Sequence, residues 1–195
     1  MSREDDEVAR LLEAAAAGLE ELVDQADEVA RIADAVVETL AGGGTLFLCG
    51  NGGSAAQCQH IAAEFTGRFK VERGGLRAIS LTTDTSALTA IGNDYGFDQV
   101  FARQLEALAR PGDLLIGLST SGQSANIVRA FESAKRLGVK SIALVGRKGC
   151  RMAELADLCL AAPGDGSATI QQCHIVALHA VCDVAERELT SGEQT

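Results

Sequence analysis

The chain has 195 residues, 47% of them apolar and 23% charged, which suits a single folded domain and excludes a disordered or fibrous protein. Its 27 acidic side chains outnumber the 17 basic ones and give a net charge of -10. Because phosphates and anionic lipids bind basic surfaces, this balance argues against a general nucleic-acid-binding or membrane-surface protein.

The first seven residues are mostly acidic, unlike a signal peptide, and no apolar run approaches the roughly 18 residues of a membrane span. We therefore expect a soluble, cytoplasmic protein. Six cysteines stand at wide spacings without a Cys-x-x-Cys pair, which predicts reduced thiols and argues against disulfides or a thiolate zinc site.

Residues 3–41 predict two helices, because apolar side chains recur there every three or four positions. Gly42-Gly43-Gly44 then ends the second helix. Each helix has one apolar stripe, so we expect it to pack on the core or on another subunit. The stripes contain Val8, Leu11, Leu12, Ala15, Leu19, Leu22 and Val23 in the first helix, and Val29, Ala33, Val36, Val37 and Leu40 in the second.

From residue 45 onward, short apolar runs typical of buried strands alternate with helical segments. This alternation predicts a doubly wound α/β fold with a parallel five-stranded sheet flanked by helices. We expect one domain over 1–195, with a helical pair at 1–41 and an α/β core at 42–190. The strands are expected at 45–49, 78–81, 114–118, 141–145 and 158–161, and the helices near 54–66, 85–108, 124–137, 150–156 and 168–189.

Ligands bind such sheets beyond the carboxyl ends of the strands, so the strand-to-helix loops are the candidate sites. The loop after the first strand reads Cys49-Gly50-Asn51-Gly52-Gly53-Ser54. Its glycines would let the backbone approach a ligand, and the following helix offers free N–H groups to an anion. It is neither a dinucleotide-binding Gly-x-Gly-x-x-Gly nor a P-loop, and the same sequence also suits a plain tight turn.

The loop after the third strand, Ser119-Thr120-Ser121-Gly122-Gln123-Ser124, offers four hydroxyls and also opens a helix. Such a neutral, donor-rich loop suits a phosphate monoester. A plain helix cap is the alternative, but it needs only one hydroxyl.

The three histidines lie on predicted helices. His60 and Glu64 are four residues apart and share a helix face, while Gln171, His174 and His179 lie on the last helix. Each histidine alone also suits an ordinary hydrogen-bonded residue. His60, Glu64, Gln171 and His179 together offer nitrogen and oxygen donors for a divalent metal, but spacing alone does not join residues over 100 positions apart.

Several motifs, in order along nearly the whole chain, resemble the phosphoheptose isomerases of the sugar isomerase (SIS) domain family. They are Gly50-Asn51-Gly52-Gly53-Ser54, His60-x-x-x-Glu64, Gly92-Asn93-Asp94, Ser119-Thr120-Ser121-Gly122-x-Ser124, and Ile170-Gln171-x-x-His174 followed by His179.

The resemblance implies an aldose–ketose isomerase that converts sedoheptulose 7-phosphate to glycero-manno-heptose 7-phosphate through an enediolate, as a homotetramer with zinc. It implies that Glu64 and His179 are the acid/base pair and that His60, Glu64, Gln171 and His179 bind the metal. The implied substrate-binding residues are Asn51, Gly52, Gly53, Ser54, Glu64, Asn93, Asp94, Ser119, Thr120, Ser121, Ser124 and Gln171.

The chain departs from the family pattern at Gln57, Thr169, Gln172 and 73–77, which bears on the exact sugar and its anomer. One alternative is an SIS isomerase of another sugar phosphate. The other is a non-catalytic SIS tetramer that binds the bacterial replication initiator. The glutamate and histidine at Glu64 and His179 favour catalysis. A sugar-phosphate sensor would carry a DNA-binding domain with a basic region, and the sequence contains no such region, so this class is not favoured.

Overall fold

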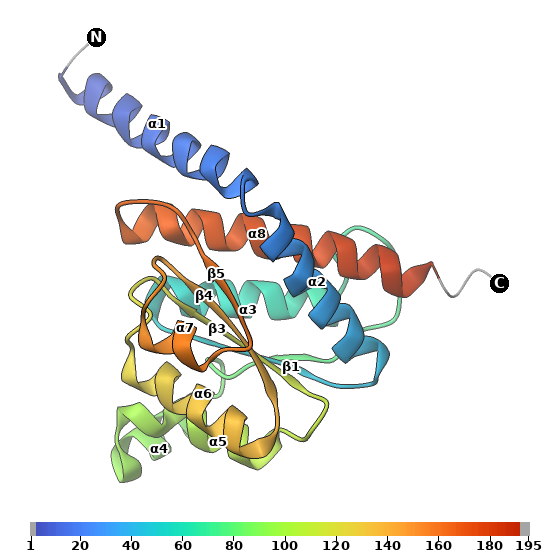
Figure 1. Cartoon of the computed structure of the whole chain (residues 1–195). Helices are drawn as coiled ribbons and strands as arrows, with labels where there is room; N and C mark the ends of the chain where they lie inside the picture. The colour runs from blue at the N-terminus through green and yellow to red at the C-terminus, as the bar shows by residue number, and fades with distance from the viewer. Residues whose placement is uncertain (1–2, 192–195) are drawn as a thin grey trace.

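The structure, a computed structural model, describes residues 3–191 and contains a five-stranded parallel sheet in the order β2-β1-β3-β4-β5 (Figure 1). The two central strands β1 and β3 are buried along their whole length, as expected for a parallel sheet covered on both faces. The predicted fold class is confirmed, and the expected strand bounds differ from the observed ones by at most one residue at either end. The strands are β1 (Leu46–Gly50), β2 (Ala78–Ser80), β3 (Leu114–Ser119), β4 (Lys140–Val145) and β5 (Leu158–Ala161).

The strand order places the two candidate loops side by side. The chain leaves β1 towards β2 on one side and later returns to form β3 on the other side of β1. Gly50, the last residue of β1, is paired with Leu118 near the end of β3. The loops that follow these strands therefore flank the point where the winding direction of the sheet reverses, which is where doubly wound sheets bind ligands.

Helices cover both faces of the sheet (Figure 1). Because side chains alternate along a strand, each β-strand contributes to two apolar cores. Leu46 and Leu48 join the core beneath α2, α3 and α8, whereas Phe47 and Cys49 join the core beneath α5, α6 and α7. The first face carries α2 (Ala26–Ala41), α3 (Gly52–Thr66) and α8 (Ser167–Thr190), and the second carries α4 (Thr85–Tyr95), α5 (Val100–Leu108), α6 (Ala125–Leu137) and α7 (Arg151–Leu155).

The helical segment expected over 85–108 is broken in the structure. Helix α4 ends at Tyr95, a 3-10 turn spans Phe97–Gln99, and α5 begins at Val100. Gly96 separates them with a φ of 93° and a ψ of 153°, a conformation that favours glycine and stops the helix. The prediction of one continuous helical segment was therefore wrong at this residue.

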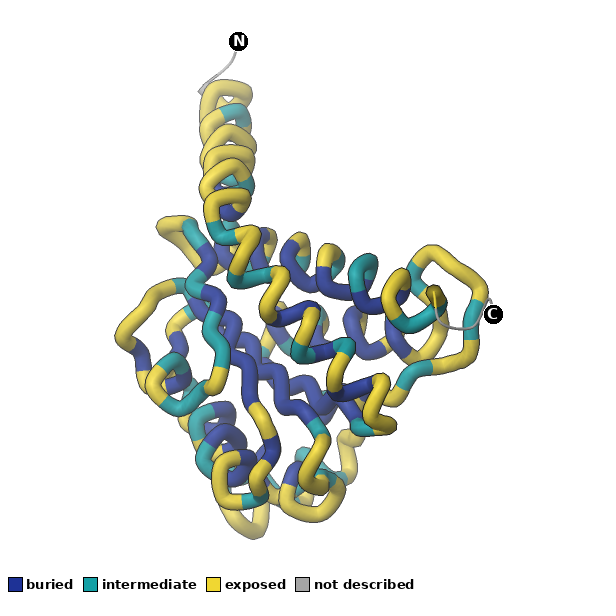
Figure 2. Tube along the Cα trace, turned by 45° about the vertical axis from the view of Figure 1, so that its right-hand side comes forward, coloured by how far each residue is buried: buried dark blue, intermediate teal, exposed yellow. Residues whose placement is uncertain are grey.

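The first helix, α1 (Arg3–Val23), extends away from the rest of the chain (Figure 1). Most of its surface is exposed (Figure 2), including the apolar Val8, Leu11 and Leu12, whereas Leu22 near its end is buried. Helix α2, by contrast, buries Ile32, Val36 and Leu40. Within one chain, the stripe of α2 is thus covered, whereas that of α1 is covered only near its end, at Leu19 and Leu22. Within residues 3–191, no helix combines the length and apolar character needed to cross a membrane.

Candidate active site

Helices α3 and α8 bring His60, Glu64 and His179 together, although more than 100 residues separate the two helices in sequence. His60 Nε2 lies 2.9 Å from His179 Nε2 and 3.3 Å from Glu64 Oε1. One ligand atom from each of the three side chains lies within 4.8 Å of the other two. The i, i+4 spacing on α3 puts His60 and Glu64 on one face, and α8 presents His179 to that face.

This His60–Glu64–His179 cluster is open to solvent on one side, since half of the His60 side chain is exposed. Burial lowers the pKa of His179 below its usual value, the neighbouring His60 ring lowers it further, and the Glu64 carboxylate partly offsets both effects. The His179 imidazole is therefore held in its neutral form near neutral pH, in which one ring nitrogen accepts a proton and the other donates one.

The donors of the cluster fit a divalent metal such as zinc, which binds imidazole nitrogen and carboxylate oxygen. Two imidazole nitrogens bound tetrahedrally to one zinc ion, at about 2.0 Å each, lie about 3.3 Å apart. Because the two histidine nitrogens are already 2.9 Å apart, a small ring movement would accommodate an ion.

Gln171 lies elsewhere along the same pair of helices. Its side-chain amide packs on Gly53, where an added Cβ would approach Gln171 Oε1 to 2.6 Å. Gly53 is about 10 Å from His60 along α3, given a rise of 1.5 Å per residue. The structure thus brings Gln171 to the start of α3 and leaves it apart from the His60–Glu64–His179 cluster.

Gln57 joins the same two helices at an intermediate level. Its Nε2 donates a hydrogen bond to the Gln171 backbone carbonyl at 2.6 Å. Its Oε1 is buried without a hydrogen-bond partner among the described residues. Gln57 therefore leaves one acceptor available between α3 and α8.

The glycine-rich loop after β1 is joined to the first turn of α6 by two amide side chains. Asn51 Nδ2 donates to Asn126 Oδ1 at 2.9 Å, and Asn126 Nδ2 donates back to Asn51 Oδ1 at 2.8 Å. Gly52 has a φ of 52°, and nothing lies within 4 Å of the position that a Cβ would take. Ser54 is buried. The Asn51 side chain therefore fixes this loop relative to the start of α6, which follows the serine-rich loop, while Gly52 presents open backbone.

The serine-rich loop forms a compact set of hydroxyls. Ser119 Oγ lies 3.4 Å from Ser121 Oγ and 3.3 Å from Ser124 Oγ. Ser124 occupies the N-cap position of α6, yet its side chain makes no capping hydrogen bond, so its hydroxyl turns to the Ser119 hydroxyl and not to the helix end. Thr120 Oγ1 lies 3.2 Å from Ser167 Oγ, which joins the loop to the first turn of α8.

Asn93 and Asp94 lie near the end of α4 and hydrogen-bond to each other, Asn93 Nδ2 donating to Asp94 Oδ1 at 2.8 Å. Both are exposed, and α4 packs mainly on α5 and the turn at Phe97–Gln99. Within the described residues of one chain, neither makes a hydrogen bond with the glycine-rich loop, the serine-rich loop or the cluster.

Sequence reasoning missed three features of the site: the Asn126 partner of Asn51, the Phe69 ring beside His179, and a buried Arg73–Glu186 pair. The Phe69 and His179 ring centroids lie 5.6 Å apart. Arg73 Nε lies 3.0 Å from Glu186 Oε1. One signal was present, because Glu186 follows His179 by seven residues and so shares its helix face.

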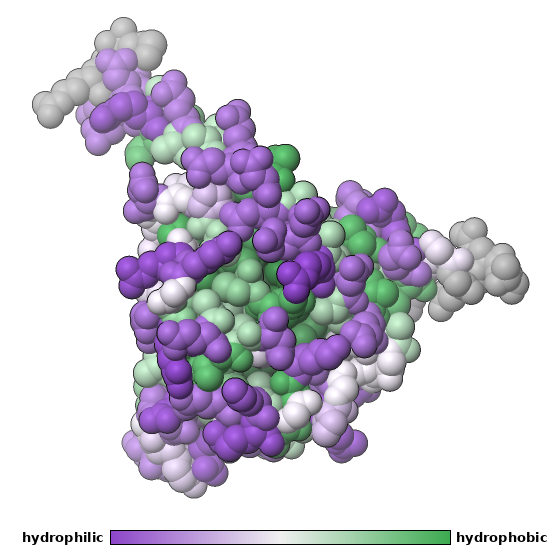
Figure 3. Space-filling view, in the orientation of Figure 1, coloured by the Kyte–Doolittle hydropathy of each residue, from purple (hydrophilic) through white to green (hydrophobic). Residues whose placement is uncertain are grey.

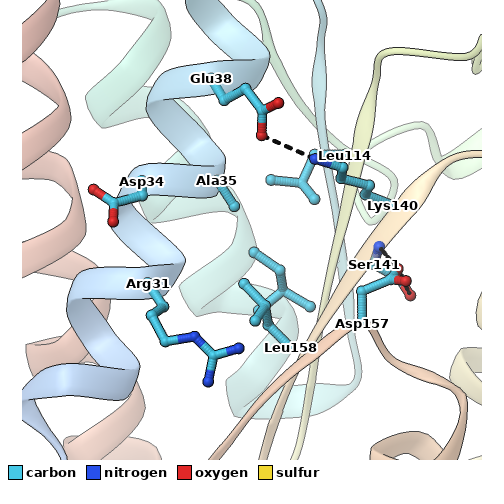
Figure 4. A pocket seen from close by; sticks show the side chains of 10 residues that line it. Arg31, Asp34, Ala35, Glu38, Leu114, Lys140, Ser141, Asp157 and Leu158 are labelled. Carbon is cyan, nitrogen blue, oxygen red and sulfur yellow. Dashed lines mark hydrogen bonds and ion pairs between the residues drawn. The ribbon is translucent and has the colours of Figure 1, made fainter.

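A hollow of about 510 Å³ lies at the amino ends of the strands, beside Leu114, Lys140 and Leu158, the first residues of β3, β4 and β5 (Figure 4). Its apolar floor is bordered by charged residues, and the Glu38–Lys140 ion pair of 2.9 Å spans its rim. In the space-filling view, apolar surface is visible between hydrophilic residues over this face (Figure 3). None of the candidate site residues lines the hollow. Ligands of doubly wound parallel sheets bind at the carboxyl ends of the strands, so we do not assign the chemistry to this hollow.

Known proteins are similar to this chain over most of its length. The SIS domain model matches residues 10–146. A phosphoheptose isomerase of Akkermansia muciniphila is 52% identical over 171 residues, 88% of this chain and 90% of that protein. The phosphoheptose isomerase structure from Neisseria gonorrhoeae has a TM-score of 0.89 and 42% identity over 94% of this chain and 98% of its own. The phosphoheptose isomerase structure from Francisella tularensis has a TM-score of 0.91 and 36% identity over 96% of this chain and 100% of its own. The chain therefore belongs to the SIS domain family and, within it, to the phosphoheptose isomerases.

Proposed function

We propose that this enzyme interconverts sedoheptulose 7-phosphate and D-glycero-D-manno-heptose 7-phosphate. The observation that carries the proposal is the convergence of Glu64, His60 and His179 where α3 and α8 pack against each other. The hydroxyl-rich loop contacts the other end of α8 through Thr120 and Ser167. This arrangement suits a substrate with a phosphate at one end and a reacting carbonyl at the other.

The reaction moves a carbonyl from C2 to C1 of the sugar. A base removes the proton from C1, an enediolate forms, and the proton returns to C2 as the carbonyl forms at C1. Glu64 is assigned the carbon-bound proton, because a carboxylate can accept it on one side of the enediolate and return it to the neighbouring carbon. His179, held neutral by its surroundings, is assigned the protons on O1 and O2. General acid–base catalysis of this kind contributes about 10²–10⁴-fold to the rate.

The phosphate is assigned to the hydroxyls of Ser119, Thr120, Ser121 and Ser124 together with the first N–H groups of α6. The sugar hydroxyls are assigned to the loop at Asn51, Gly52, Gly53 and Ser54, and to Gln171, Asn93 and Asp94. The open backbone at Gly52 and the Gln171 amide beside Gly53 support the first part of this assignment.

Zinc is the proposed metal, with His60, Glu64 and His179 as ligands and Gln171 as a fourth ligand that its side chain would have to move to supply. When bound, the ion would act as a Lewis acid and stabilise negative charge on the sugar oxygens. If Glu64 holds the ion through Oε1, the atom 3.3 Å from His60 Nε2, its second carboxylate oxygen can take the carbon-bound proton.

A homotetramer is the proposed assembly, and the cytoplasm the proposed location. The exposed apolar side chains of Val8, Leu11 and Leu12 on α1 support self-association, because an amphipathic helix is stable when its apolar face is covered. The open side of the His60–Glu64–His179 cluster and the exposed Asn93 and Asp94 are compatible with a site completed by a neighbouring subunit.

Proton exchange tests the proposal. In deuterated solvent, the enzyme should exchange the C1 proton of sedoheptulose 7-phosphate, followed by NMR with added zinc and with a chelator. Glu64→Gln should abolish exchange and retain ligand binding. Glu72→Gln, which removes a carboxylate that is 90% exposed, should leave exchange unchanged.

The same experiment separates the alternatives. Exchange with a pentose or hexose phosphate but not with the heptose would identify an isomerase of another sugar. An absence of exchange with every sugar phosphate, at all metal concentrations, would favour the non-catalytic assembly factor.

A further inference from the structure

The segment that follows α3, residues 67–77, contains no helix or strand but is tied to α8 by a buried charged pair. The side chains of Arg73 and Glu186 are 4% and 1% exposed, and Arg73 Nε donates to Glu186 Oε1 at 3.0 Å. Glu186 also accepts hydrogen bonds from the backbone N–H groups of Phe69, Lys70 and Val71 at 2.9, 2.6 and 2.9 Å. The carboxylate thus fixes three consecutive residues of the segment.

Arg73 completes this network towards α3. Its guanidinium donates to the carbonyl oxygens of Phe65, Gly67 and Gly74, and its Nη2 donates to the Glu64 carbonyl at 2.8 Å. A buried ion pair destabilises a protein unless its remaining donors and acceptors are also hydrogen-bonded. The number of partners here therefore indicates a specific structural network and not a chance contact. Arg73 thereby anchors the backbone of Glu64 as well as the segment.

The network places the Phe69 ring against His179. The Glu186 carboxylate holds the Phe69 N–H, and the Phe69 ring stacks on the His179 imidazole with a centroid separation of 5.6 Å and an interplanar angle of 28°. The Phe69 ring also contacts Lys70, whose Nζ lies 5.2 Å from the ring centroid. Lys70 Nζ in turn forms an ion pair with Asp183 Oδ1 at 2.9 Å. The His60 ring meets His179 edge-on at 5.2 Å and 68°. The imidazole is therefore bounded by two rings.

We propose that Phe69, held by the Arg73–Glu186 pair, is a positioning residue that fixes the rotamer of His179 so that its Nε2 faces His60 and Glu64. Phe69 has no polar side-chain atom and takes no part in proton transfer. Its ring restricts the rotation of the imidazole. The network ties the Phe69 backbone to the Glu186 side chain on α8 and, through Arg73, to backbone carbonyls of α3. This role rests on the proposed function of His179.

The expected effect is on turnover rather than on substrate affinity. The contact between two aromatic rings favours the packed arrangement by about 2- to 10-fold in an equilibrium constant. Small misplacements of a catalytic group can lower the reaction rate by up to about 10²-fold. Phe69→Leu should therefore lower kcat about tenfold with little change in KM. Phe69→Tyr, which keeps the ring, should restore kcat. Phe97→Leu is the matched control, since the Phe97 ring is 63% exposed in the turn before α5.

A second readout is independent of activity. The chain has three histidines, so a carbon–proton spectrum of the metal-free protein resolves the His60, His174 and His179 rings. In Phe69→Leu, the His179 ring signal should move and show rotamer averaging, whereas the signal of the buried His174 should stay in place. Glu186→Gln, examined in the same way, should reproduce the His179 change if the protein stays folded.

The two readouts separate the possible failures. An unchanged kcat together with an unchanged His179 signal in Phe69→Leu would overturn the positioning role. A shifted His179 signal in a protein whose wild type shows no isomerisation would support the positioning role and contradict the proposed function. A rise in KM without a fall in kcat would assign Phe69 to substrate binding and overturn the proposal.

Discussion

His174 provides a test of how the buried half of α8 responds to pH. The residue is fully buried, and its Nε2 lies 3.2 Å from the Val145 carbonyl oxygen at the end of β4. Its Nδ1 has no partner among the described residues. Nε2 therefore donates to Val145, and the ring is neutral. Protonation would place a cation in the core with a single hydrogen bond.

The size of the effect follows from the pKa of this ring. Burial lowers the pKa of His174 from 6.5 to about 4, a change that the hydrogen bond to Val145 only partly offsets. The unfolded chain takes up a proton near pH 6.5, whereas the folded protein does so only near pH 4. Stability from this residue is thus complete above pH 6.5 and is lost as the pH falls towards 4. The loss amounts to about 3 kcal/mol at 1.36 kcal/mol per pKa unit.

The assay compares urea unfolding of the wild type and of His174→Gln between pH 7.5 and pH 4. The glutamine keeps a donor for Val145 and removes the titration. Both proteins are measured with chelator and at one protein concentration, because metal binding and subunit association would otherwise contribute. The wild type should lose about 3 kcal/mol more than the variant over this range. Equal losses in the two proteins would refute the explanation, since the other titrating groups are the same in both.

Three further substitutions test neighbouring features. Gly53→Ala should displace the Gln171 amide, which an added Cβ would approach to 2.6 Å. We expect isomerisation to fall at least about tenfold, while thermal unfolding shows stability unchanged or raised by up to about 1 kcal/mol. Gly117→Ala places a Cβ 2.3 Å from the Phe131 ring and should cost about 1–3 kcal/mol in urea unfolding. Desolvation would raise the pKa of Glu186, but its backbone hydrogen bonds and Arg73 lower it overall. Glu186→Gln should therefore cost most at neutral pH, about 3–5 kcal/mol, with the difference from wild type shrinking as pH falls below 4.5.

The sequence predicted the sheet well because the strands are short apolar runs, and four of the five have a glycine or serine at or directly after their end. Central strands such as Leu46–Gly50 and Leu114–Ser119 are buried throughout, so their composition marks them clearly. The break at Gly96 was missed because the apolar pattern resumes after it in a similar helical period. A single glycine inside such a pattern does not reveal its φ.

The candidate site was harder to predict from the residues themselves. Spacing on one helix joins His60 to Glu64, but the contact with His179 depends on α3 and α8 lying side by side, which only the assembled fold provides. The family resemblance named these residues without their distances. The Arg73–Glu186 pair had no local signal at Arg73, because the segment around it has no periodicity. Its structure comes from the side chain of a distant helix.

Helix α8 is the element that turns these separate motifs into one site. Ser167, Gln171, His179 and Glu186 contact, in order, the serine-rich loop, the start of α3, His60 and the segment at Phe69. At 100° per residue, these four positions lie within about 120° of one another around the helix. Gln171 and His179 are about 12 Å apart along its axis. The distance between the proposed phosphate-binding hydroxyls and the proposed acid/base pair is therefore set by a single helix, so a change of its register on the sheet would move every one of these contacts together.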